Sequence, residues 1–378
     1  MKKTGRILLI ITILLAITYF FLPGYVQTAL IYQNVDIDDY TIFHNRTIKT
    51  GTAEPWKLSK DYNKYQFSAK DRAKIEAYKP VAFLVIQDQK ILYEEYWEDY
   101  SPSSLSNSFS ASKSIVSLLV GIAIDDGYIK SIDQKVKDFI PEYDSPENKN
   151  LSIRDLLTMS SGLNWDEAYT SPFSKTTEAY YGTDLSGMIK SLKVVDEPGK
   201  QYNYLSGNAE VLAMILQAAT GQTISSYASE KIWKKIGAEH DALWSLDREN
   251  GLEKAYCCYY SNARDFARFG QLILNNGQWD STQIISASYL KDAISPASYL
   301  LNEEGTAPVD YYGYQFWIID YKGMKIPYMR GILGQYIYAI KEKNAVVIRL
   351  GHKRSHEYVN HHTKDIYLYL DEAMKILK

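Results

Sequence analysis

A serine and a lysine three residues apart, in Ser110-Ala-Ser-Lys113, are the strongest candidates for covalent catalysis in this 378-residue chain. They precede residues 114–125, which are apolar almost all round and predict a helix buried in a domain. A serine at such a helix start lies near free backbone N–H groups and the positive dipole end, which would stabilise an oxyanion. Lys113 would share its helix face, and burial favours the neutral amine that can take the serine's proton.

The spacing alone does not identify a catalytic pair. It recurs at Ser288-Tyr-Leu-Lys291, in an ordinary amphipathic stretch. The alternative for Ser110 and Lys113 is a capped helix with a solvated lysine. The surrounding elements must therefore decide.

Those elements predict an α+β fold. Residues 81–96 predict two strands with a tight turn around Asp88-Gln89. Strands at both ends of the domain with helices between them indicate a central antiparallel sheet and an inserted helical region, about residues 130–255. The later strands are predicted at 314–319, 335–340 and 345–350, and the other helices at 152–157, 209–220, 263–274 and 365–377.

The N-terminus predicts an export signal or membrane anchor. A basic head with Lys2, Lys3 and Arg6 precedes an uncharged run from Ile7 to Val26, long enough to cross a hydrocarbon core of about 30 Å as a helix. The head should stay in the cytoplasm, which places the rest outside. A cleaved signal peptide and a buried cytoplasmic helix are the alternatives. We expect an anchor or signal over 1–30, an extended lead-in over 31–60 and one domain over 61–378.

Composition excludes several classes of protein. A hydrophobic fraction of 46% excludes wholesale disorder, and 42 Lys+Arg against 45 Asp+Glu leave no basic surplus for nucleic acid. A disulfide between the neighbours Cys257 and Cys258 needs a strained ring, so we expect two small buried residues. Four histidines within 352–362 lack a metal-binding spacing and predict a solvated loop. No metal or cofactor is predicted, and the oligomeric state stays open.

Five ordered segments carry a family resemblance. Besides Ser110-Ala-Ser-Lys113, they are Leu151-Ser-Ile-Arg-Asp-Leu-Leu-Thr-Met-Ser-Ser-Gly-Leu-Asn-Trp165, Pro198-Gly-Lys-Gln-Tyr-Asn-Tyr-Leu-Ser-Gly207, Ala263-Arg-Asp-Phe-Ala-Arg-Phe-Gly270 and Gly331-Ile-Leu-Gly-Gln335. Together they resemble the penicillin-recognising serine hydrolases, in the class C β-lactamase-like branch with esterases and 6-aminohexanoate-dimer hydrolase. The resemblance covers about residues 75–351 and implies an α/β/α sandwich with an all-helical insertion.

The resemblance also implies site residues. Ser110 would be the nucleophile, and Lys113 and Tyr204 would share the general-base role, with Tyr204 returning the proton to the leaving group. The backbone N–H groups of Ser110 and Gln335, the latter after Gly334, would form the oxyanion hole. Trp165 and Trp317 could line an aromatic cleft, although ordinary packing is the alternative.

Two departures from the family pattern affect the expected substrate. Ser206 stands where many relatives have asparagine, and Ile332-Leu333-Gly334 stands where penicillin-binding members have a Lys/His-Thr/Ser-Gly triplet. The Lys or His of that triplet is the cation that helps to hold a substrate carboxylate in the family. Its absence here argues against a substrate with a carboxylate at this position, unless Arg330 or His352 supplies the charge.

The resulting hypothesis is a membrane-anchored, extracytoplasmic serine hydrolase, secreted if the N-terminal segment is cleaved. It would cleave a small-molecule or cell-envelope ester or amide, or transfer the acyl group. A D-Ala-D-Ala carboxypeptidase or β-lactamase is the first alternative. A domain of this fold that binds ligands without turnover is the second.

Overall fold

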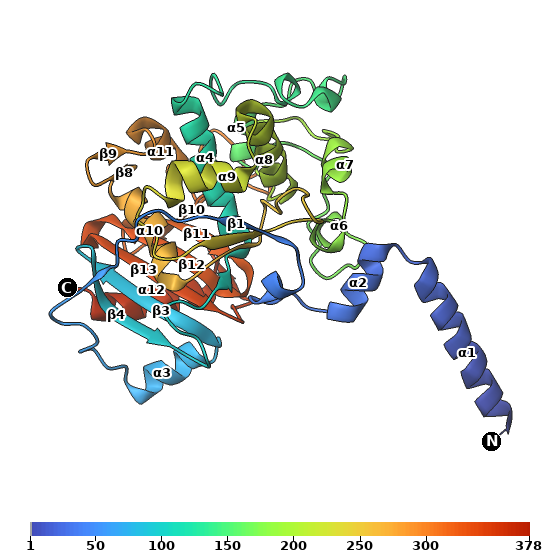
Figure 1. The fold of residues 1–378 in the computed structure, drawn as a ribbon, viewed down its shortest axis with the longest axis horizontal. Helices are drawn as coiled ribbons and strands as arrows, with labels where there is room; N and C mark the ends of the chain where they lie inside the picture. The colour runs from blue at the N-terminus through green and yellow to red at the C-terminus, as the bar shows by residue number, and fades with distance from the viewer. Residues whose placement is uncertain (1) are drawn as a thin grey trace.

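The computed structural model describes residues 2–378. Met1 and the side chains of Lys2, Lys3, Leu15 and Ala16, including two cations of the predicted basic head, lie outside the described set. Helix α1 (Lys2–Phe21) projects away from the rest of the chain (Figure 1). Its segment Thr4–Phe21 is long and apolar enough to cross a membrane, a test that a signal sequence also passes.

Helix α2 (Gly24–Tyr32) follows α1 and joins the main body of the molecule. It packs against α6 (Lys175–Tyr181). Val26 of α2 is buried, and the ring of Tyr32 stacks on Tyr181 of α6 with centroids 6.1 Å apart. The residues after the apolar run are therefore tied to the domain.

A seven-stranded sheet forms the centre of the domain, in the order β10-β11-β12-β13-β3-β4-β2. All neighbours pair antiparallel except β2 and β4, which are parallel. The predicted antiparallel sheet is therefore correct apart from this edge. Its strands are β2 (Lys57–Leu58), β3 (Pro80–Gln87), β4 (Lys90–Tyr96), β10 (Trp317–Tyr321), β11 (Met324–Gly331), β12 (Gln335–Ile340) and β13 (Ala345–Gly351).

Side chains alternate between the two faces of this sheet, as strand geometry requires. On β3, Leu84 and Ile86 join the core under α4 (Ser112–Asp125) and α10 (Ala263–Leu274). Phe83 and Val85 join the core under α3 (Ala69–Glu76) and α12 (Lys364–Ile376). Helices cover both faces, which gives the α/β/α layering visible in Figure 1.

The inserted region between α4 and α10 is mainly helical. It contains α5 (Ile153–Leu157), α6, α7 (Leu185–Lys190), α8 (Gly207–Thr220) and α9 (Ile224–Ala228). It is not all-helical, because β6 (Ala242–Ser245) lies inside the predicted 130–255 boundary. The remaining elements are α11 (Ala287–Ala293), β8 (Gln278–Trp279), β9 (Thr282–Gln283), β14 (Tyr358–Val359), β15 (His362–Thr363) and short turns of other helix types.

A second sheet, in the order β1-β6-β7-β5, includes part of the predicted extended lead-in. Strand β1 (Asn45–Ile48) falls within 31–60 and pairs antiparallel with β6. Strand β5 (Ser106–Asn107) pairs with β7 (Tyr259–Ser261). This sheet ends directly before the Ser110 motif and so helps to hold it.

Candidate active site

Ser110 and Lys113 meet as the spacing predicts. Ser110 lies in a single 3₁₀ turn, Phe109–Ala111, at the start of α4. The Lys113 Nζ atom is 3.0 Å from Ser110 Oγ and 2.7 Å from the carbonyl oxygen of Tyr256. Lys113 is only 1% exposed, so the solvated-lysine alternative is wrong.

The turn that carries Ser110 is fixed from several sides. Phe109 has φ of 43°, in the left-handed region that non-glycine residues rarely adopt. The Asn107 side chain stabilises it by accepting hydrogen bonds from the Phe109 N–H at 2.9 Å and the Cys258 N–H at 3.1 Å. A Cβ atom on Gly331 would lie 2.1 Å from the Ser108 carbonyl oxygen. Only glycine lets β11 approach this closely.

Tyr204 lies beside the pair, in the loop before α8. Its ring centroid is 5.3 Å from Lys113 Nζ and 5.8 Å from the ring of Trp317. Ser206, two residues later, donates from its N–H and its hydroxyl to Glu167, both at 2.6 Å. Glu167 also accepts from the Tyr169 hydroxyl. No sequence signal singled out Glu167, because its role depends on a loop far from Ser206 in the chain.

Ser110 separates two cavities of different character. The first has a volume of about 450 Å³, and its lining contains no charged side chain within residues 2–378. The second, of about 380 Å³, is lined by Glu303, Arg330, Arg354 and His361 besides aromatic residues. Ser110, Tyr169 and Ile332 line both. We call them the uncharged and the charged cavity.

The structure brings together some of the predicted substrate-binding residues. Ser206 lines the uncharged cavity, and Tyr204 and Trp317 line the charged one. The remaining three, Trp165, Gly334 and Gln335, line neither.

Each of these three residues has a packing role instead. Trp165 is 6% exposed and donates from Nε1 to Thr176. The Gly334 carbonyl accepts from Arg349. The Gln335 amide is buried against the backbone of Gly351.

The sequence predictions for the cations and histidines within residues 330–362 are only partly correct. Of the two cations considered as replacements, Arg330 lines the charged cavity, with its guanidinium carbon 3.2 Å from the Trp317 ring centroid. His352 instead contacts Asp36. The solvated-loop prediction holds for His361, which is exposed in a turn and also lines the charged cavity. It is wrong for His362, which is buried in β15 and whose pKa burial lowers to about 3.

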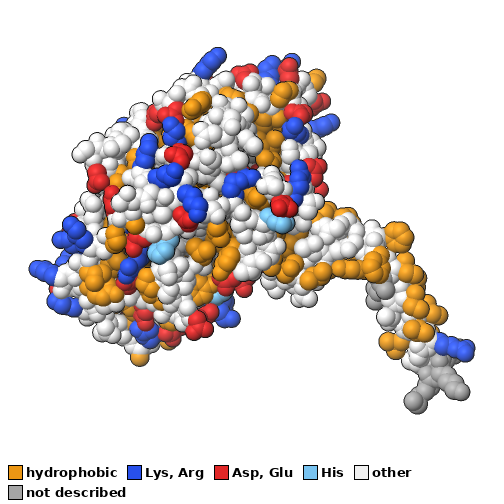
Figure 2. Space-filling view, in the orientation of Figure 1, with side chains coloured by type: hydrophobic (Ala, Val, Ile, Leu, Met, Phe, Trp, Pro, Cys, Tyr) orange, Lys and Arg blue, Asp and Glu red, His pale blue; other side chains and the backbone are white. Residues whose placement is uncertain are grey.

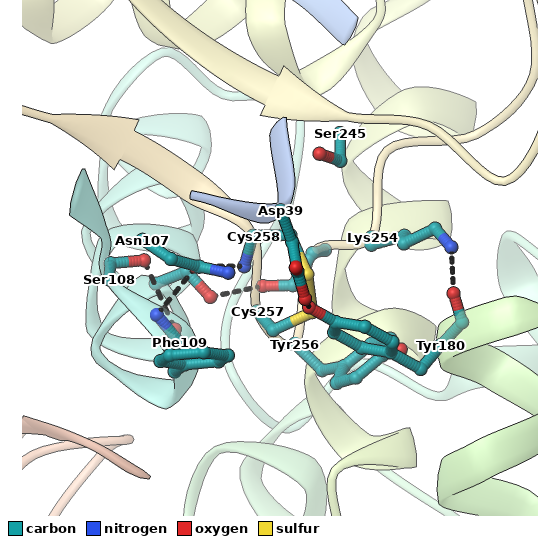
Figure 3. The surroundings of a disulfide bond; sticks show 12 residues. Asp39, Asn107, Ser108, Phe109, Tyr180, Ser245, Lys254, Tyr256, Cys257 and Cys258 are labelled. Carbon is teal, nitrogen blue, oxygen red and sulfur yellow. Dashed lines mark hydrogen bonds between the residues drawn. A yellow bond between two sulfur atoms is a disulfide. The ribbon is translucent and has the colours of Figure 1, made fainter. Parts of the chain in front are cut away.

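The expectation for the two cysteines is wrong in one respect. Both are buried, as predicted, but their sulfur atoms are bonded to each other. Figure 3 shows this bond between Asn107 and Phe109 on one side and Tyr180 and Lys254 on the other. Cys257 lines the uncharged cavity, one residue after the carbonyl that holds Lys113.

Lys254, behind the same cavity, is a buried amine that should make stability depend on pH. Its Nζ lies 4.0 Å from the Phe43 ring centroid and donates to the Tyr180 carbonyl. Burial lowers its pKa from 10.5 to about 7, although Asp247, Glu210 and Asp39 oppose the shift. Between these values the unfolded chain binds one more proton than the folded chain. This residue alone therefore makes the free energy of unfolding rise with pH there, by at most about 1.4 kcal/mol per pH unit.

A Lys254→Met variant tests this contribution. Denaturant unfolding from pH 7 to pH 10 should show the wild-type protein gaining stability relative to the variant as the pH rises. Parallel stability curves would contradict the expectation.

Comparison with known proteins places this chain in a family of hydrolases. A sequence model of the family described as Beta-lactamase matches residues 72–369. The 6-aminohexanoate-dimer hydrolase of Paenarthrobacter ureafaciens is 27% identical over 289 residues, 71% of each chain. A provisionally assigned D-alanyl-D-alanine carboxypeptidase of Escherichia coli K12 is 27% identical over 190 residues, 43% of each chain.

A solved structure shows the same fold. It is a Bacillus anthracis protein provisionally assigned as a 6-aminohexanoate-dimer hydrolase. The two superpose with a TM-score of 0.77 at 21% identity, covering 90% of this chain and 93% of that one.

Proposed function

This chain belongs to the beta-lactamase family, and from that premise we propose that it is a serine hydrolase that cleaves an ester or amide through an acyl-enzyme. Ser110 Oγ attacks the carbonyl carbon, and the Lys113 amine takes the hydroxyl proton. As the bond between the acyl carbon and the leaving alcohol or amine breaks, Tyr204 gives its proton to the leaving atom and takes the proton held by Lys113. Water, or an alcohol or amine, then attacks the acyl carbon and gives up a proton to the Lys113–Tyr204 pair, which protonates Ser110 Oγ as its bond to the acyl carbon breaks.

The oxyanion of each tetrahedral intermediate needs two N–H donors. Ser110 supplies one. We assign the other to Ile332, in place of the predicted Gln335, because Ile332 follows Gly331 directly and lines both cavities beside Ser110. Gln335 lines neither.

The observation that carries the proposal is the buried contact between Lys113 Nζ and Ser110 Oγ. The experiment is intact-mass detection of an acyl adduct after mixing the protein with a panel of activated esters and amides. We expect one adduct per chain, absent in Ser110→Ala and retained in Ser288→Ala, the matched variant at the second Ser-x-x-Lys. A folded protein that no ester or fluorophosphonate modifies would refute the proposal.

A second candidate, a carboxypeptidase or β-lactamase, is favoured by Arg330 and Arg354 in the charged cavity. Guanidinium groups bind carboxylates well, so they could replace the lost triplet cation. A labelled penicillin that acylates Ser110 stably would favour this candidate over the esterase or amidase.

We also propose that α1 anchors the protein in a membrane, with the catalytic domain outside the cytoplasm. Support comes from the length and apolar composition of Thr4–Phe21 and from the basic head before it. Cleavage of this segment would release the domain.

A further inference from the structure

The wall of the uncharged cavity is partly built by the segment that follows the apolar N-terminal helix. Ala29 and Leu30 of α2 line it, together with Gln33, Asn34 and Val35. These residues precede the 72–369 region that matches the family. The cavity therefore runs from Ser110 to a part of the chain that the family match does not include.

The chemistry of this wall favours an apolar occupant. Apolar and aromatic side chains make up much of the lining, among them Ala29, Leu30, Phe109 and Ile332, and the remaining lining residues are mostly uncharged polar ones, chiefly serines and threonines. Its volume of about 450 Å³ falls in the range of about 300–1,000 Å³ that is usual for small-molecule sites. No charged side chain among the described lining residues can pair with an ionised group, so burying such a group there would be unfavourable.

The other side of Ser110 has the opposite character. Arg330, Arg354 and Glu303 line the charged cavity. A substrate whose scissile carbonyl sits at Ser110 would therefore place an apolar part on one side and a polar part on the other. This is the polarity of an acyl chain joined to a polar group.

The surface around α2 is continuous with this apolar side. Leu30 is 47% exposed, and Phe20 and Phe21 at the end of α1 are 77% and 85% exposed. Hydrophobic side chains run along α1 and continue over α2 in Figure 2. Leu30 therefore lines the uncharged cavity and is exposed on the helix that directly follows α1.

We propose that the uncharged cavity binds an unbranched acyl chain, so that the substrate is an acylated polar molecule with its chain against α2. The inference rests on the proposed function for the bond that is cleaved. Its acyl-chain site can nevertheless be measured without catalysis. The chain could come from a bilayer lipid or from a soluble acyl ester or amide.

The test is the binding of unbranched primary amides, butanamide to decanamide, to the full chain carrying Ser110→Ala. The protein is kept in a steroid detergent, which has no alkyl chain to compete. We expect the dissociation constant to fall roughly fourfold for each added methylene until the cavity is filled. Constant affinity along the series would overturn the proposal.

Ala29→Trp should fill the cavity from α2 and weaken decanamide binding at least about tenfold, with little effect on butanamide. Ala29→Leu should give a smaller loss, and it keeps the test valid if the tryptophan variant does not fold. Thr28→Trp is the matched control, because Thr28 lies on the same helix but lines a separate cavity beside α7. Equal losses from Ala29→Trp and Thr28→Trp would contradict the assignment.

Reconstitution into phosphatidylglycerol vesicles separates the two sources of the chain. Loss of amide binding in the vesicles indicates competition by bilayer lipid, and undiminished binding indicates a soluble substrate. The failures are also distinguishable. Chain-dependent binding without an acyl adduct on Ser110 would refute the proposed function alone, and an adduct without chain dependence would refute this inference alone.

Discussion

Replacing Lys113 by methionine is expected to lower kcat/KM for an activated ester by roughly 10²–10⁴-fold, the usual contribution of a general base. Lys113 Nζ contacts Ser110 Oγ at 3.0 Å. Methionine keeps an unbranched side chain in this buried position and cannot take the serine's proton. Stopped-flow measurement of the acylation rate would show the loss in the first chemical step.

The matched control is Lys291→Met, at the second Ser-x-x-Lys. Lys291 lies on α11 and is exposed, so its loss should leave the acylation rate nearly unchanged. The circular dichroism spectrum of each variant should match that of the wild type. A Lys113→Met protein that is acylated at the normal rate would exclude the proposed base.

Arg268→Met is expected to give the largest loss of stability, about 3–5 kcal/mol in the free energy of unfolding. The Arg268 side chain is 1% exposed, and its Nε donates to Asp265 at 2.9 Å. Its other nitrogens donate to the carbonyl oxygens of Ile236 and Glu54. The variant leaves a buried carboxylate without its cation and two carbonyl groups without a donor, which is why the cost is high.

Urea denaturation measures this effect, and Lys322→Met is its control. Lys322 pairs with Asp371 at the surface, where ion pairs contribute little. We therefore expect almost no shift in its unfolding midpoint. Similar midpoints for Arg268→Met and the wild type would show that the buried pair is not important for stability.

The sequence predicted those elements whose own residues carry a clear helix or strand pattern. The apolar run after Lys113 identified α4, and two strand-forming segments on either side of a tight turn at Asp88-Gln89 identified the β3–β4 hairpin. These signals are local, because helix and strand periodicities depend on residues close in the chain.

Two strands escaped prediction for different reasons. Strand β11 contains Pro327, which lacks a backbone N–H and argues against a strand, yet it pairs there with Ile318 of the adjacent strand β10. Strand β1 has little periodicity and pairs with β6, which is far away in the chain. That distant partner cannot be identified from the β1 segment itself.

The site followed the same rule. The three-residue spacing was enough to place Ser110, in the 3₁₀ turn, beside Lys113 at the start of α4, since consecutive helical turns fix that geometry. The choice between Gln335 and Ile332 depends on the short turn after Gly331, which spacing does not describe. The Glu167–Ser206 contact joins two loops, and no periodic pattern could have indicated it.

The order of strands in the central sheet has a consequence for how the chain folds. Strand β3 pairs with β13, with Val85 opposite Val347, so β3 cannot complete its pairing until a segment far later in the chain has been synthesised. Pairings so distant in sequence slow folding, because a long loop must close before any contact forms. Until then, β3 leaves an almost wholly apolar edge unpaired, and such edges promote aggregation. We therefore expect slow refolding from denaturant and a nascent chain that depends on chaperones.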